Sequence, residues 1–186
     1  MMFPAWLAGW PAWGLAMVYP GQAAWGDFPS RLANPWMLGT VYAAEAARQL
    51  YWLGFAAAGA ASIGIGMLAR NCIREPRTML LLAMLSALAL PFFLPKMLER
   101  YFFLAGLISI ALAVSYTSGA TVFIALAVET ASLLSLLTYM YFYADPYLTI
   151  VGALFAASAL IVTMVLVRRL SLERLLSAVD RPPLLT

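Results

Sequence analysis

The sequence predicts an all-α membrane protein, a polytopic bundle of about six membrane segments in one domain over residues 1–186. Two observations carry this prediction. The chain is 65% hydrophobic and 10% charged, whereas a soluble domain is about 45–50% apolar and about 25% charged. Long apolar runs also follow one another with only short polar turns between them. No long polar stretch offers a domain boundary, so a single bundle is expected.

The first membrane segment is expected within residues 1–20, which carry no charged side chain. Such a run is just long enough to cross the bilayer as a helix, although Pro4 and Pro11 would kink or break it. A signal peptide is a competing interpretation that fits poorly, because no basic residue precedes the apolar run. Residues 21–50 are more polar and predict a surface loop followed by a short helix from about Pro35.

Five further spans are predicted within residues 51–167. They are expected at residues 51–68, 78–93, 101–116, 120–143 and 147–167. The first of the five is rich in alanine and glycine, and small residues let a neighbouring helix approach closely. The glycines assigned to helix packing are Gly54, Gly59, Gly64 and Gly66.

The tail, residues 168–186, predicts a short amphipathic helix on the cytoplasmic leaflet. Its apolar residues repeat at the spacing of one helix face, and basic residues lie alongside. They are Leu172, Leu175, Leu176 and Val179. A helix that docks a partner protein is the alternative interpretation.

The basic residues predict the orientation of the bundle. If the turn at residues 70–77 is cytoplasmic, the tail is cytoplasmic too, and that side holds seven of the eleven Lys and Arg residues. This distribution satisfies the positive-inside rule. All six tryptophans precede Leu53 and predict an aromatic belt at the opposite interface. The sequence therefore predicts a multi-pass protein of the bacterial inner membrane with a cytoplasmic C-terminus.

Several kinds of chemistry are excluded by composition. The chain has no histidine and one cysteine, so an internal disulfide, a cysteine-cluster metal site and a histidine-ligated haem or chlorophyll are not expected. No metal and no cofactor is predicted. The basic residues form no run, so nucleic acid is not an expected partner.

One carboxylate lies within a predicted span. Glu129 falls near the middle of residues 120–143, with Ser132 on the same polar ridge. An intramembrane carboxylate is costly and marks a candidate functional site. Two interpretations stay open: a buried polar contact that fixes helix packing, or a site for a ligand, a lipid or a proton.

A second charged group lies between two spans. Lys96, Glu99 and Arg100 precede Tyr101 at the predicted outer surface. Lysine and arginine together suit a phosphate or an anionic headgroup. The competing interpretation is that these cations only anchor helix ends at the membrane surface.

This second group carries a resemblance to a known family. The segment LPKMLERYFFLA resembles the Pro-Lys/Arg-Met-His-Glu-Arg-Tyr-Phe segment of bacterial membrane glycosyltransferases of the GT-C class, which are mannosyltransferase-like enzymes that use polyprenyl-phosphate sugars. The segments YPGQAAWGDFPSRLANPW and ETASLLSLLTYMYF are similar to flanking parts of the same enzymes. The resemblance covers most of the chain, as the later half of a longer enzyme, and implies that Lys96, Glu99, Arg100 and Tyr101 bind a lipid phosphate.

The chain departs from the family pattern in ways that bear on activity. Leu98 replaces the family's histidine, and Gly106 replaces an acidic residue that often follows the aromatic pair. The family's half with the catalytic aspartate loop has no counterpart, so no catalytic residue is assigned.

Three hypotheses of function follow. The first is a non-catalytic integral membrane subunit, a glycosyltransferase-derived scaffold packed against other membrane subunits and lipids. The alternative is an active half of a GT-C glycosyltransferase that transfers sugar from a polyprenyl-phosphate donor at the periplasmic face. A small transporter or lipid-binding module centred on Glu129 is the third, disfavoured because no inverted repeat is evident.

Overall fold

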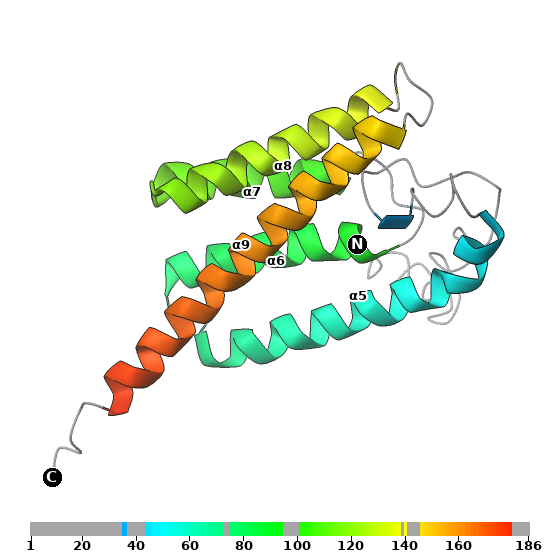
Figure 1. Ribbon diagram of the computed structural model, residues 1–186. Helices are drawn as coiled ribbons and strands as arrows, with labels where there is room; N and C mark the ends of the chain where they lie inside the picture. The colour runs from blue at the N-terminus through cyan, green and yellow to red at the C-terminus, as the bar shows by residue number, and fades with distance from the viewer. Residues whose placement is uncertain are drawn as a thin grey trace, which may run out of the picture.

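The computed structural model describes residues 35–36, 44–72, 75–94, 101–138, 140 and 146–179. These residues form five helices and no strand, which confirms the all-α prediction for this part of the chain. The helices are α5 (Ala44–Cys72), α6 (Pro76–Phe93), α7 (Phe102–Ser115), α8 (Gly119–Leu137) and α9 (Pro146–Val179). Successive helices run in opposite directions, with α9 crossing the others obliquely (Figure 1).

Four of these helices are long and apolar enough to cross a membrane, as expected of a multi-pass membrane protein. The candidate spans are Trp52–Arg70, Pro76–Phe93, Gly119–Leu137 and Tyr147–Glu173. Helix α7 is equally apolar but has 14 residues, about 21 Å at 1.5 Å per residue, which is shorter than a hydrocarbon core of ~30 Å. The predicted segment at residues 1–20 lies outside the described residues.

Two predicted helix boundaries are wrong. Helix α5 begins at Ala44 and continues without a break through the predicted start of a span at residue 51, because the sequence AEAARQL consists of good helix formers. Helix α9 likewise continues through residue 168, where a separate tail helix was predicted, and ends at Val179. Leucine, arginine and glutamate favour helix there, and no glycine or proline interrupts residues 168–178.

Helix α9 is longer than a membrane is thick. Its 34 residues extend about 50 Å at 1.5 Å per residue, against a hydrocarbon core of ~30 Å. Its last turns project past the ends of the other helices (Figure 1). The C-terminal segment is therefore a straight extension of a span.

Helix α6 lies at the centre of the bundle. It packs against α5, α7 and α9, and α8 packs against α7 and α9, so four helices enclose one core. The largest fully buried side chains of that core come from all four helices: Leu81, Met84, Leu85, Leu88, Phe102, Leu112, Ile124, Val128 and Val167. Buried alanines on α8 and α9 (Ala127, Ala131, Ala156 and Ala159) allow these two helices to approach closely. Helix α5 packs mainly on α6 and leaves most of its surface outside the bundle.

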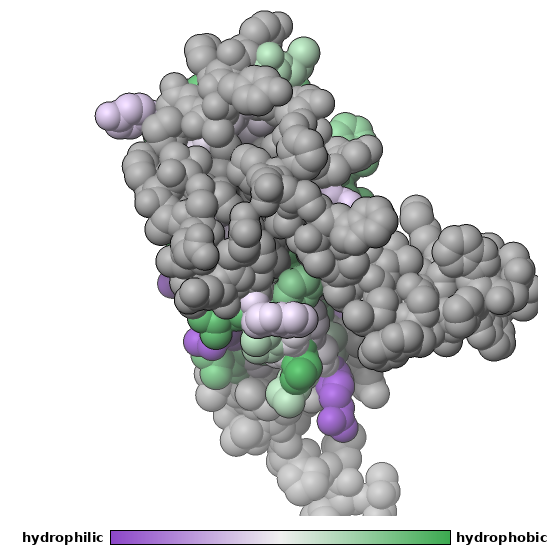
Figure 2. Space-filling view, turned by 90° about the vertical axis from the view of Figure 1, so that its right-hand side faces the viewer, coloured by the Kyte–Doolittle hydropathy of each residue, from purple (hydrophilic) through white to green (hydrophobic). Residues whose placement is uncertain are grey.

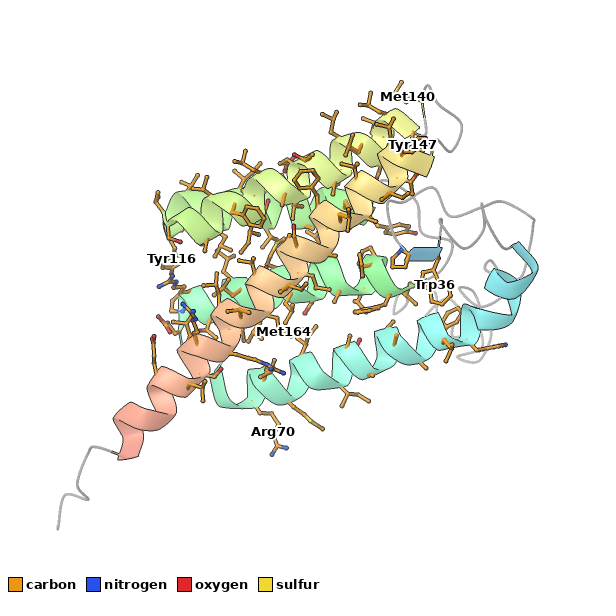
Figure 3. The ribbon with its side chains drawn as sticks, in the orientation of Figure 1. Trp36, Arg70, Tyr116, Met140, Tyr147 and Met164 are labelled. Carbon is orange, nitrogen blue, oxygen red and sulfur yellow. The ribbon has the colours of Figure 1, made fainter. Side chains whose placement is uncertain are left out.

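Basic residues gather at one end of the bundle. Arg77, at the start of α6, lies over the ring of Tyr116 at the end of α7, with 5.6 Å between the guanidinium carbon and the ring centroid. Arg70 at the end of α5 lies at the same end (Figure 3), and so do Arg168 and Arg169 in the second half of α9. Viewed from the side at right angles to Figure 1, the coloured part of the surface shows a few hydrophilic side chains beside hydrophobic ones (Figure 2).

The turn between α7 and α8 closes this end. Ser118 caps α8, and its hydroxyl accepts a hydrogen bond from the backbone N–H of Thr121 at 3.3 Å. The Thr121 hydroxyl in turn accepts one from the Ser118 backbone N–H at 2.9 Å. This reciprocal capping box satisfies two donors that a helix start leaves free and fixes the hairpin that brings α8 beside α7.

Candidate functional site

Glu129 lies on the outer face of α8. It shares that face with Val122, Leu126, Leu133 and Leu136, which are all exposed large hydrophobic residues. Glu129 is itself exposed and lies ten residues beyond Gly119, about 15 Å along the helix axis. A carboxylate therefore stands in the middle of a surface that is otherwise suited to lipid.

The carboxylate rests against a glycine of the neighbouring helix. A Cβ atom added to Gly106 on α7 would lie 2.6 Å from Oε1 of Glu129 and 3.8 Å from Oε2. Gly106 is buried, so the Glu129 side chain occupies the space that a side chain at residue 106 would need. The contact brings together the acidic residue of α8 and a glycine of α7 that are 23 positions apart in the chain.

Glu129 has no polar partner in the part of the chain that the structure describes. Ser132, predicted on the same ridge, is partly buried and makes no hydrogen bond to it. The hydroxyls of Ser135 and Thr138 donate to carbonyls of their own helix, to Ala131 at 2.9 Å and to Leu134 at 2.8 Å. Two hydroxyls that follow Glu129 on α8 therefore bond to the backbone of their own helix.

This geometry bears on the two interpretations of Glu129. The side chain is exposed at the edge of the α7–α8 contact, so it is not buried among the described residues. A carboxylate at the centre of a lipid-facing helix costs ~2.5–3.5 kcal/mol on insertion scales. No described residue pairs with the carboxylate to offset this cost.

The predicted anion site lies mostly outside the described residues. Lys96, Glu99 and Arg100 fall there. Tyr101 is described, at the N-terminus of α7, with 45% of its surface exposed. The role assigned to these four residues stays a prediction.

The four glycines of α5 have different surroundings. A Cβ at Gly54 would lie 2.7 Å from Cζ2 of Trp36 and 2.9 Å from the carbonyl oxygen of Phe93. Trp36 Nε1 donates a hydrogen bond to that same oxygen at 2.6 Å, so Gly54 gives the indole room beside α6 (Figure 3). A Cβ at each of the other three, Gly59, Gly64 and Gly66, would meet no atom within 4 Å.

A groove between α5, α6 and α9 was not expected from the sequence. It has a volume of about 310 Å³. Its walls are apolar except at Arg168. The side chains come from two consecutive helices, α5 and α6, and from the distant α9. No local sequence pattern shows that α9 packs beside the other two.

The described residues contain no group of three or more His, Cys, Asp or Glu side chains that could hold a metal ion.

No family model, curated protein or solved structure matches the chain. The candidate sites are therefore the outward carboxylate of Glu129 and the groove that ends at Arg168.

Proposed function

We propose that the chain is a non-catalytic integral membrane subunit, a glycosyltransferase-derived scaffold that packs helix to helix within a larger complex of the bacterial inner membrane. The basic end, with Arg70, Arg77, Arg168 and Arg169, faces the cytoplasm under the positive-inside rule. The C-terminus of α9 then lies in the cytoplasm as well.

One observation carries this proposal: Glu129 is exposed on an apolar helix face and has no partner among the described residues. Ionisable side chains in membrane spans almost always face a bundle interior or pair with another group. A helix of another subunit that brings a basic residue or a hydrogen-bond donor against α8 would satisfy the carboxylate. The exposed leucines around it, Leu126 and Leu133, would supply the apolar contact.

Co-purification from native membranes tests this function. The full chain is solubilised in a mild detergent, and the integral membrane proteins that accompany it are compared for wild type, Glu129→Leu and Glu173→Leu. Glu173 is an exposed residue of α9 at the last position of its candidate span and serves as the matched control.

We expect a stoichiometric membrane partner with wild type and with Glu173→Leu, and its loss with Glu129→Leu. The proposal is wrong if wild type purifies alone as a monomer, or if both variants keep the same partner.

The second candidate is an active half of a GT-C glycosyltransferase, and the contact between Glu129 and Gly106 favours it. Position 106 is where the family often carries an acidic residue, and here the Glu129 carboxylate reaches that place from α8. Gly106 lies one turn from the start of α7 at Phe102, and a carboxylate at that place could serve as a base toward an acceptor hydroxyl.

Transfer from a polyprenyl-phosphate sugar in membranes that contain the chain tests this candidate. Activity abolished by Glu129→Gln and by Arg100→Ala would support it. Unchanged envelope glycans in both variants would eliminate it.

A further inference from the structure

We propose that the groove between α5, α6 and α9 binds one acyl chain of an anionic glycerophospholipid, with the lipid phosphate held by Arg168. This proposal concerns a different surface from the Glu129 face and does not depend on the proposed function. It rests on the shape of the groove, on its position along the spans and on the single charge at its end.

The groove suits a hydrocarbon chain. Its lining residues are apolar apart from Arg168: Ala61, Gly64, Ile65, Met67, Leu68, Leu85, Ala89, Phe93, Leu160 and Met164. Its volume of about 310 Å³ lies at the lower end of the ~300–1,000 Å³ range of small-ligand pockets. Gly64 contributes to this space, because a Cβ there would meet nothing within 4 Å.

The length of the groove matches one leaflet. From Leu160 to Arg168 the groove follows eight residues of α9, about 12 Å at 1.5 Å per residue. Half of a hydrocarbon core of ~30 Å is ~15 Å. A transmembrane helix of a partner would need an apolar surface through both leaflets, so an acyl chain fits this groove better.

The charge at the end of the groove selects the headgroup. Arg168 is exposed, and no carboxylate among the described residues pairs with it. It stands at the basic end of the bundle, where Arg70 also lies and points away from the helices (Figure 3). A guanidinium offers two parallel donors to a phosphate, and a basic residue near a membrane surface favours anionic lipid. Met164, one turn earlier on α9, lies on the apolar side of the same site.

Native mass spectrometry of the full chain in detergent tests this site, with dioleoyl phosphatidylglycerol and dioleoyl phosphatidylcholine as the probes. We expect one phosphatidylglycerol to bind more tightly than phosphatidylcholine. Arg168→Gln should weaken phosphatidylglycerol binding roughly fivefold, and Arg168→Lys should restore part of it. Arg169→Gln is the matched control, because Arg169 is exposed but does not line the groove, and it should change binding less than twofold.

A second pair of variants tests the apolar part. Gly64→Leu should fill the groove and weaken binding of both lipids, whereas Gly59→Leu, also in open space but outside the groove, should not. Equal affinity for the two lipids, equal losses in Arg168→Gln and Arg169→Gln, or unchanged binding in Gly64→Leu would overturn the proposal. So would a photo-crosslinker at Met164 that captures another polypeptide instead of lipid.

Discussion

Replacing Gly54 with alanine should destabilise the protein, although the same change at Gly59 should stabilise it. Both glycines lie within α5, where alanine is favoured over glycine by about 1 kcal/mol. The new methyl group at residue 54 would fall 2.7 Å from Trp36 and 2.9 Å from the carbonyl oxygen of Phe93. The Phe93 oxygen is a backbone atom of α6 and cannot change position by rotating a side chain. Either α5 or the Trp36 indole must therefore move.

The size of the effect follows from these contacts. Overpacking costs about 1–3 kcal/mol, and loss of the hydrogen bond from Trp36 to Phe93 costs about 1 kcal/mol more. The higher helix propensity of alanine offsets about 1 kcal/mol of this cost. The free energy of unfolding should therefore fall by about 1–3 kcal/mol in Gly54→Ala and rise by about 0.5–1 kcal/mol in Gly59→Ala.

Titration with SDS in mixed micelles, followed by circular dichroism, measures both changes. A double-mutant cycle with Trp36→Ala sharpens the test, because removal of the indole should make Gly54→Ala less costly. Equal stability of Gly54→Ala and Gly59→Ala would refute the packing described for α5.

Three further predictions concern the remaining contacts. Tyr116→Leu should cost about 0.5–2 kcal/mol through loss of the cation–π contact with Arg77, and the cost should be smaller in an Arg77→Leu background in the same SDS titration. Ser118→Ala should lower the free energy of unfolding by about 1 kcal/mol through loss of the α8 cap, and an unchanged value would contradict the capping box with Thr121. Glu129→Leu should raise the stability of the isolated chain in bilayers by up to about 3 kcal/mol. A loss of stability instead would show that the carboxylate has a partner within the chain.

The sequence predicted those features that depend on local pattern. The apolar runs identify helices α6, α8 and α9 within a few residues of their observed starts, because an unbroken apolar stretch of this length has few other stable forms. Glu129 was predicted as a candidate site because it is the one acidic residue within a predicted span. The turn that contains Ser118 lies in the gap between the predicted spans at residues 101–116 and 120–143.

Features that depend on how helices meet could not be predicted. The sequence pattern treats all four glycines of α5 alike, but only Gly54 has close neighbours. Gly59 and Gly66 are exposed, and Gly64 lines the open groove beside α6 and α9. The contact of Glu129 with Gly106 needs the register of α8 against α7. The end of α9 was misplaced because an amphipathic pattern does not reveal whether a helix bends at the membrane surface.

Site-specific photo-crosslinking on the outer face of α8 tests the central claim most directly. A photo-reactive residue at Leu133, which is 55% exposed and one turn from Glu129, is compared in native membranes with one at Val114, exposed on α7. We predict that Leu133 crosslinks to one other integral membrane protein, that the crosslink disappears in Glu129→Leu, and that Val114 does not give it. Adducts with lipid alone at Leu133 would contradict the account of this chain as a subunit held through its outward carboxylate.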